Sequence, residues 1–234
     1  MAKAGRLLKY AAIAAIVILA AAKTALFLTA PKVKDLPPLK NGDLVFQSTA
    51  DLQSMAVVLA SDSLYTHMGM IKTTGRYPVV VEAVGPVEET PLQRWIDRGL
   101  EKRVAIYRIR GLKPKDAGKA FAWARKHYGK PYDFFFLPGD DAFYCSELIH
   151  DAYGKGAGLS VGRVQKVGEL TPSSFMDDVI RDRWQAYPPC QGKPGMTLEK
   201  CRDIIMKQEL VTPASIAHDP KSDPVYSNYL FDNK

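Results

Sequence analysis

The hydrophobic pattern changes its period several times between residues 42 and 154. Short apolar runs, which are typical of strands, cover residues 43–47, 67–71, 79–84 and 104–109. Apolar residues at three- and four-residue spacing predict helices over residues 49–59, 90–98, 115–128 and 145–154. Thr90 is expected to cap the second helix, with Pro91 at its first position, and Gly154 to end the last one. The chain therefore mixes strands and helices over a length that can form one good core.

The first 30 residues differ from the rest of the chain. The basic residues Lys3, Arg6 and Lys9 precede an apolar stretch over residues 10–30 in which Lys23 is the only charge. This order is the export pattern, and about 20 apolar residues can span a membrane. We expect residues 1–30 to be an uncleaved anchor in the cell envelope, with the body of the chain on the periplasmic or outer side. A signal segment cleaved near Lys23 and a buried first helix of a cytosolic domain are the alternatives.

Prolines divide the remaining chain into three parts. Residues 31–40 contain three prolines and are predicted to form an extended linker. Residues 41–210 are expected to form the folded domain. The tail over residues 211–234 carries Pro213, Pro220 and Pro224, and it is predicted to be extended and to lie over the domain or to be loose.

Composition and charge narrow the class of protein. With 47% hydrophobic and 24% charged residues, the chain is neither a disordered protein nor a multi-span membrane protein. The net charge of +7 is spread along the sequence, without a basic run that alternates with aromatic residues. Nucleic acid is therefore not an expected partner. A basic enzyme that works near anionic lipid or cell-wall polymer fits this charge.

The three cysteines fall into two kinds. Cys190 and Cys201 lie eleven residues apart in a stretch rich in proline and glycine, whereas Cys145 stands alone in an apolar segment. In an oxidising compartment the first two could form a disulfide worth roughly 3 kcal/mol on the loop-entropy model, and Cys145 would remain a free thiol. Two unpaired surface cysteines are the alternative.

Cys145 is a candidate nucleophile because of its place at the start of a predicted helix. Unsatisfied amides and the helix dipole lower a thiol pKa at that position. A buried structural cysteine is an equally good interpretation of this segment alone.

His67 and Glu82 are candidate partners of Cys145. His67 begins an apolar strand and could accept the proton of the thiol, although a lone histidine beside apolar residues is more often part of the core. Glu82 interrupts the apolar run 79–84, where an unpaired buried charge would cost several kcal/mol. A neighbouring strand that carries His67 would supply its partner. A position on a solvated strand edge is the alternative for Glu82.

Five motifs together resemble a known family over about residues 40–175. The motifs Gly42–Phe46, His67–Met70 and Glu82–Ala83 resemble the second half of an NlpC/P60 cysteine peptidase. The motifs Gly129–Tyr132 and Phe143–Leu148 resemble its first half. Because the halves occur in swapped order, the chain resembles the permuted papain-like hydrolases of the YiiX/YebB-like branch, which are related to the lecithin-retinol acyltransferase group.

This resemblance implies a fold and a set of catalytic residues. The fold would be α+β, a circularly permuted papain-like domain with an antiparallel sheet packed against helices. Cys145 would be the nucleophile, His67 the general base and then acid, and Glu82 the residue that orients His67. Tyr132 would assist the oxyanion together with the backbone N–H of Cys145.

Two departures from the family pattern weaken any transfer of cell-wall peptide specificity. Glu147 follows Ser146 where the family's Asp-Cys-Ser-Gly pattern has glycine. Glu82 stands where many relatives carry histidine or a polar amide.

The leading functional hypothesis is a hydrolase that cleaves amide bonds of peptide or peptidoglycan-stem type through an acyl-enzyme. A lipid-directed thioesterase, phospholipase or acyltransferase with the same residues is the main alternative, and a non-catalytic binding module is the third. The run Phe134–Phe136 is expected to pack in the core rather than to line an acyl-binding groove. The oligomeric state stays open.

No cofactor is expected. HExxH and CxxC spacings are missing from the sequence, so a metal site is not predicted. The glycine-rich segment 154–158 lacks the preceding strand that a phosphate-binding loop requires, and His127 and His150 are expected to be non-catalytic.

Overall fold

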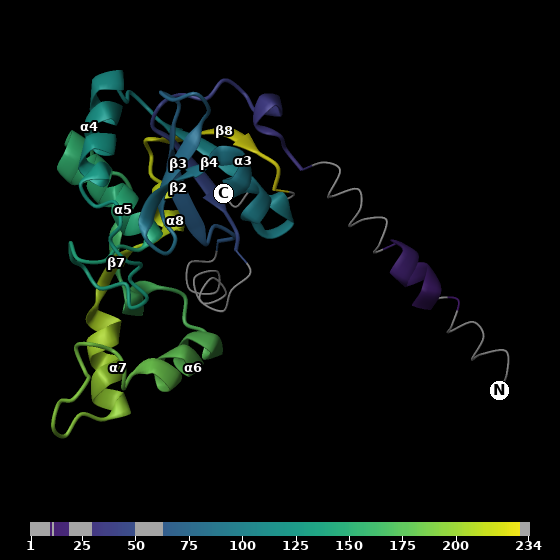
Figure 1. Ribbon diagram of the computed structural model, residues 1–234. Helices are drawn as coiled ribbons and strands as arrows, with labels where there is room; N and C mark the ends of the chain where they lie inside the picture. The colour runs from purple at the N-terminus through teal and green to yellow at the C-terminus, as the bar shows by residue number, and fades with distance from the viewer. Residues whose placement is uncertain (1–9, 11, 19–29, 50–62, 230–234) are drawn as a thin grey trace.

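A computed structural model describes residues 10, 12–18, 30–49 and 63–229 of the chain. Its centre is a six-stranded sheet in the order β4-β3-β2-β1-β5-β8, in which all neighbours are antiparallel (Figure 1). The strands are β1 (Asp43–Gln47), β2 (His67–Lys72), β3 (Val79–Ala83), β4 (Val87–Pro91), β5 (Ala105–Ile109) and β8 (Ser222–Ser227). A separate two-stranded sheet pairs β6 (Val164–Lys166) with β7 (Glu209–Val211). The predicted α+β class with an antiparallel sheet is confirmed.

Helices cover both faces of the large sheet and extend below it (Figure 1). They are α3 (Leu92–Arg98), α4 (Pro114–Arg125), α5 (Cys145–Asp151), α6 (Ser174–Arg183), α7 (Leu198–Lys207) and α8 (Pro213–Ala217). Short 3-10 turns occur at Val33–Asp35, Leu100–Lys102 and Val167–Glu169. The helix that begins at Cys145 continues past Gly154 as a π-helical turn over Ala152–Gly156, so Gly154 does not end it as predicted.

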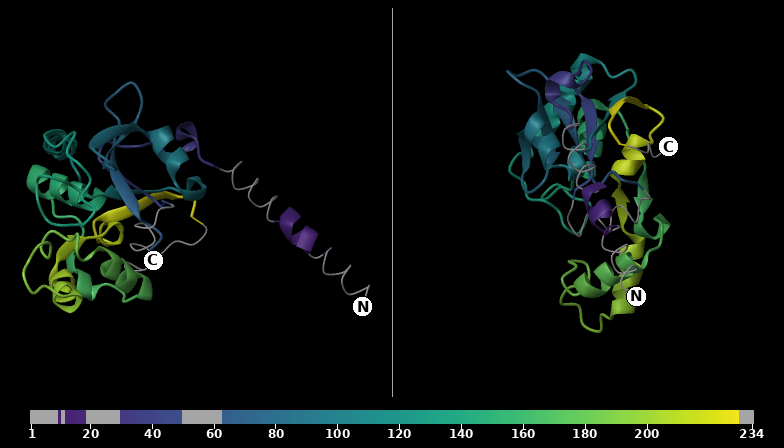
Figure 2. Two further views of the ribbon diagram at one scale, coloured as in Figure 1. Left: turned by 60° about the horizontal axis from the view of Figure 1, so that its bottom comes forward. Right: turned by 90° about the vertical axis from the view of Figure 1, so that its right-hand side faces the viewer.

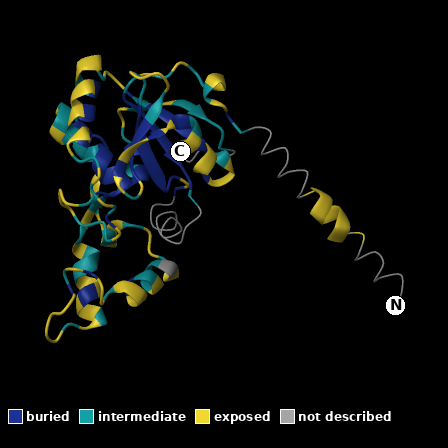
Figure 3. Cartoon of the chain, in the orientation of Figure 1, coloured by how far each residue is buried: buried dark blue, intermediate teal, exposed yellow. Residues whose placement is uncertain are grey.

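The central strands are buried on both faces, which explains their continuous apolar runs. In β1, Leu44 and Phe46 pack into a core shared with α4 and α5, whereas Val45 packs into a second core shared with α3. Figure 3 shows the buried strands enclosed by helices whose outer faces are exposed. The sheet is therefore a rigid support for side chains at the ends of its strands.

The helix predicted over 90–98 begins two residues later than expected. Thr90 pairs with Val80 as part of β4, and Pro91 precedes the first turn of α3. The Thr90 hydroxyl donates to the Glu82 carboxylate instead of capping the helix. A Thr-Pro signal for a helix start is thus also compatible with the last residues of a strand. Apart from Thr49, the helix predicted over 49–59 lies outside the described residues.

The C-terminal segment is an integral part of the sheet, which corrects the prediction of an extended tail from residue 211. The segment forms α8 and then β8, whose Tyr226 pairs with Ile106 of β5. Pro224 lies at a register shift in this edge strand, a position where the missing N–H of proline is tolerated. The folded domain therefore extends beyond the predicted boundary at residue 210.

The helices α6 and α7 form a separate layer below the sheet (Figures 1 and 2). A disulfide joins Cys190 to Cys201, and Tyr187 packs with it in a small core. Phe135 and Leu137 from the loop before α5 pack against the same core. The layer is thus attached to the segment that leads to Cys145.

Most of the predicted anchor over 1–30 lies outside the described residues. Within the described part of the chain, residues 12–18 are helical, and no helix has both the length and the apolar character needed to cross a membrane.

Candidate active site

Cys145 is the first residue of α5. The preceding Tyr144 is extended (φ −94°, ψ 163°), so the chain turns into the helix at the cysteine itself. The side chain is buried, with 3% of the residue exposed. Burial alone would raise the pKa of the thiol, but the hydrogen bond from His67, its positive charge and the backbone N–H groups of Met68 and Ser146 lower that pKa overall. The site therefore favours a thiolate.

His67 lies between Cys145 and Glu82. It opens β2, and this strand packs directly against α5. Its Nε2 is 2.5 Å from Oε2 of Glu82, and its ring also hydrogen-bonds the Cys145 side chain, which leaves Nδ1 as the nitrogen for sulfur. Burial alone would lower the pKa of His67, yet the bonds to Cys145 and Glu82 raise it to about 9. The imidazole is therefore held as an imidazolium beside the sulfur of Cys145.

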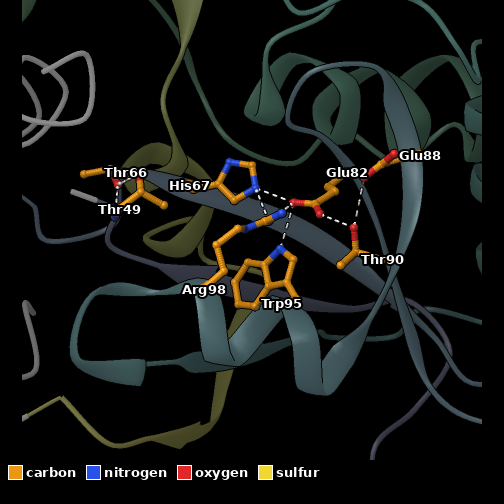
Figure 4. Close-up of polar contacts among 8 residues, drawn as sticks. All are labelled: Thr49, Thr66, His67, Glu82, Glu88, Thr90, Trp95 and Arg98. Atoms are coloured by element: carbon orange, nitrogen blue, oxygen red, sulfur yellow. Dashed lines mark hydrogen bonds and ion pairs between the residues drawn. The ribbon is translucent and has the colours of Figure 1, made fainter. Parts of the chain in front are cut away.

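Glu82 is fully buried in β3 and accepts from several side chains at once (Figure 4). Oε1 accepts from the Thr90 hydroxyl at 2.6 Å. Oε2 accepts from the Trp95 indole at 2.9 Å and from Arg98 at 2.5 Å, in addition to its bond with His67. Burial would raise the pKa of the carboxyl, but His67 and Arg98 lower it to about 2. Glu82 is thus an anion near neutral pH.

Three of these partners were not identified from the sequence. Trp95 and Arg98 lie three residues apart on α3, a spacing that places both on one helix face. The Trp95 ring also stacks on His67 with centroids 5.9 Å apart. The sequence signal that could have identified them is Arg98 three residues after Trp95 in a predicted helix. Thr90 carried no separate signal, because its local sequence matches a helix cap.

The structure places Tyr132 in the wall of the pocket that Cys145 also lines. Its backbone pairs with Phe143 just ahead of α5, and its ring is tilted against Phe134 with centroids 5.2 Å apart. Tyr132 and Cys145 line one pocket. The four residues named from the sequence are therefore brought together at one place.

This pocket is an apolar cavity of about 340 Å³ that opens beside Cys145. Its walls come from the loop before α5, from β7 and from the layer of α6 and α7. The apolar residues that line it include Phe134, Phe135, Phe136, Val167, Leu170, Met176, Val179, Ile180, Trp184, Ile205 and Leu210. Phe136 packs against the main core and Phe135 against the small core, whereas Phe134 is 58% exposed, and all three phenylalanines line the cavity. The prediction of core packing rather than a groove lining therefore holds only in part.

The two histidines expected to be non-catalytic bond to backbone. Nδ1 of His127 is 3.1 Å from the carbonyl oxygen of Trp123, and Nδ1 of His150 is 2.7 Å from that of Val161. Among the described residues, no three side chains of histidine, cysteine, aspartate or glutamate form a group that could hold a metal ion.

Glu147, which stands where the family has glycine, does not line the cavity and bonds to the loop before α5. Its Oε1 accepts the N–H of Gly139 at 3.3 Å. Burial raises the pKa of this carboxyl to about 8, and the nearby Asp151 and Asp133 add to the effect. Glu147 is therefore protonated near neutral pH and adds no charge to the site.

Comparison with known proteins agrees with this architecture. Residues 38–226 match the family described as permuted papain-like amidase enzyme, YaeF/YiiX, C92 family. The chain belongs to this permuted papain-like amidase family. The family predicted from the swapped motif order is thereby confirmed.

Two relatives of this amidase family are similar to the chain. The uncharacterized protein YiiX of Escherichia coli strain K12 is 40% identical over 136 residues, which cover 58% of this chain and 67% of that protein. The crystal structure of the metalloprotein YiiX from Escherichia coli O157:H7 aligns with a TM-score of 0.71 and 31% identity. That alignment covers 81% of this chain and 98% of the other.

Proposed function

We propose that this member of the permuted papain-like amidase family is a cysteine amidase with Cys145 as nucleophile, His67 as proton carrier and Glu82 as the residue that orients His67. The observation that carries the proposal is the hydrogen-bonded line from Cys145 through His67 to Glu82 beside an open cavity. The lowered pKa of Cys145 and the raised pKa of His67 support a preformed ion pair, which a binding module would not require.

The proposed reaction uses these groups in sequence. The Cys145 thiolate attacks the amide carbon, a carbon–sulfur bond forms, and the carbonyl electrons move to oxygen. The backbone N–H of Cys145, which has no partner within the helix at this position, and the Tyr132 hydroxyl stabilise that oxyanion. His67 protonates the departing amine as the carbon–nitrogen bond breaks. His67 then takes a proton from water as the water oxygen attacks the thioester carbon, and the carbon–sulfur bond breaks, which releases the acid and regenerates the thiolate.

Glu82 does not exchange protons in this reaction. Its oxygens already accept from Thr90, Trp95 and Arg98, and its pKa is too low for it to act as a base near neutral pH. It fixes the ring of His67 and stabilises the imidazolium.

The decisive experiment compares the protein with its Cys145→Ala and Cys145→Ser variants. Turnover of an N-acyl p-nitroanilide and labelling by iodoacetamide should both be lost in Cys145→Ala. The disulfide cysteines do not react with iodoacetamide without reduction, so Cys145 is the expected single site of labelling. Unchanged turnover in Cys145→Ala would refute the proposal.

The cavity favours a second candidate function that uses the same residues, namely hydrolysis or transfer of a fatty acyl group. Aromatic and aliphatic side chains dominate its walls beside Cys145, which suits an acyl chain better than a charged stem peptide. Incubation with peptidoglycan fragments, phospholipids and N-acyl amino acids in parallel, followed by mass spectrometry, separates the candidates. Products from the stem peptide alone would favour the peptidase function, and products from the ester lipids would favour the lipid-directed function.

We also propose that the protein works on the outer side of the cytoplasmic membrane. The basic residues followed by an apolar stretch in residues 1–30 and the disulfide of Cys190 with Cys201 both support this location. Fractionation of cells that carry the full chain, with protease accessibility of the domain, tests it. Recovery in the cytosol with both thiols reduced would contradict the location.

A metal is not part of the proposal, although the YiiX protein of known crystal structure is called a metalloprotein. The donors of this site do not fit one, because Glu82 already accepts from Thr90, Trp95 and Arg98 and His67 is held between Cys145 and Glu82.

A further inference from the structure

Gln208 makes an unusual set of hydrogen bonds at the far wall of the cavity. Its amide nitrogen donates to two successive carbonyl groups, of Phe135 at 2.9 Å and of Phe136 at 2.5 Å. Its side-chain oxygen accepts from the Tyr187 hydroxyl at 2.6 Å. A single side chain therefore joins the layer of α6 and α7 to the loop that precedes the nucleophile.

The loop needs such support because its backbone is strained. Phe136 has φ 54°, in the left-handed region that residues other than glycine rarely adopt. Within the loop, the Asp133 carboxylate accepts the N–H of Phe135 at 2.8 Å. Asp133 thus binds an amide from within the loop, and Gln208 is the residue from outside the loop that binds its carbonyls.

Gln208 is itself held independently of this loop. Its carbonyl accepts the N–H of Val167 at 2.9 Å, and its N–H donates to Ile205 at the end of α7. Its partner Tyr187 packs beside the disulfide in the small core of the lower layer. The side chain can therefore transmit the position of that layer to the cavity wall.

We propose that Gln208 is a positioning residue that fixes the shape of the cavity wall and so selects substrates with an apolar acyl group next to the scissile bond. This proposal rests on the proposed function, since it specifies the acyl part of the amide substrate. Gln208 acts through its hydrogen bonds to Phe135 and Phe136, which line the cavity, and not through the ion pair of Cys145 and His67. Loss of Gln208 should therefore change KM more than kcat.

The test compares Gln208→Met with the wild type. Methionine keeps the approximate volume and removes both N–H donors and the acceptor. Gln191→Met is the matched control, because Gln191 is exposed in the same layer and does not line the cavity. The substrates are dodecanoyl and acetyl p-nitroanilides, which share one leaving group.

The ratio of kcat/KM for the dodecanoyl over the acetyl substrate should fall about tenfold in Gln208→Met, as expected for the loss of the two neutral hydrogen bonds to the loop carbonyls, and the fall should appear in KM. Tyr187→Phe removes one hydroxyl and should give a smaller shift of the same sign. An unchanged ratio in folded Gln208→Met would overturn the proposal. If that variant did not fold, an unchanged ratio in Tyr187→Phe would overturn it.

A binding measurement separates this proposal from the proposed function. Calorimetric titration of dodecanoyl glycine amide into Cys145→Ala requires no turnover. Affinity should fall about tenfold when Gln208→Met is added and should stay constant when Gln191→Met is added. If the wild type hydrolysed neither anilide but the affinity fell as expected, the amidase function would fail and the role of Gln208 would stand. Equal affinities would overturn the role of Gln208 alone.

Discussion

At the residue scale, the site depends on the charge of Glu82, which is fully buried and has four polar partners. The sequence alone could show only that this charge interrupts an apolar strand. A buried carboxylate in an apolar strand requires a partner, and this requirement correctly indicated His67. It did not indicate Arg98, because the contact between α3 and β3 is tertiary, and the spacing of Arg98 from Trp95 does not reveal what that helix face contacts. The sequence therefore predicted that His67 and Glu82 lie together, but not that Arg98 adds a positive charge beside them.

The activity should depend on pH through the ion pair of Cys145 and His67. The pair exists above the lowered pKa of Cys145 and is lost as His67 gives up its proton near pH 9. We therefore expect kcat/KM for an amide substrate to fall above about pH 9. In Glu82→Gln the imidazolium loses its anionic partner, so this decline should move to lower pH, and activity should drop about 100-fold or more. A pH–rate profile of both proteins checks this, and an unmoved alkaline decline in the variant would contradict it.

Stability at acid pH should depend on the same carboxylate. The pKa of Glu82 falls from 4.5 to about 2 on folding, so its contribution is present above pH 4.5 and is lost as the pH falls toward 2. The wild type should therefore lose on the order of 3 kcal/mol more unfolding free energy across this range than Glu82→Gln. Urea unfolding at several pH values measures the difference. Parallel curves for the two proteins would show that Glu82 is not responsible.

At the scale of elements, local patterns were reliable where a strand is buried on both faces. Inside the runs 43–47 and 67–71, polar residues occur only at the ends, because β1 and β2 lie in the middle of the sheet. The edge strand β8 was missed, since Pro224 and several polar residues resemble a tail. Its pairing with β5 joins residues more than 100 positions apart in the sequence, as in Ile106 with Tyr226. Periodicity within a short window carries no information on such a pair.

The attachment of β8 gives a test at this scale. The Asn228 side chain accepts the N–H of Val104 at 2.7 Å and donates to the carbonyl of Lys102 at 3.3 Å, which fixes the end of the strand against β5. Asn228→Ala should lower the unfolding free energy by about 1–2 kcal/mol, because two backbone groups lose their partner. Urea denaturation measures this, with exposed Gln191→Ala as the control. A loss no larger than that of the control would mean that the segment after residue 211 contributes little to the fold.

At the scale of the whole molecule, Cys145 and the outer wall of the cavity beside it belong to two differently stabilised parts. Cys145, His67 and Glu82 are held by the large sheet and its helices, whereas the outer wall of the cavity belongs to the layer of α6 and α7 with its disulfide. Loss of Cys190 and Cys201 should therefore affect the cavity far more than the ion pair. On the loop-entropy model, the double variant Cys190→Ser/Cys201→Ser should lower the unfolding free energy of that layer by roughly 3 kcal/mol.

Because the two parts are stabilised separately, the double variant should change the layer of α6 and α7 but not the reactivity of Cys145. Iodoacetamide should still label Cys145 at close to the wild-type rate, because the thiolate depends on His67 and on the backbone of β2 and α5. Hydrogen exchange of the amides in α6 and α7 should become faster, since their small core loses its covalent link. Mass spectrometry reads both quantities on one sample, and Gln191→Met provides the control. Slower labelling of Cys145 in step with the faster exchange would show that the layer and the ion pair form one cooperative unit.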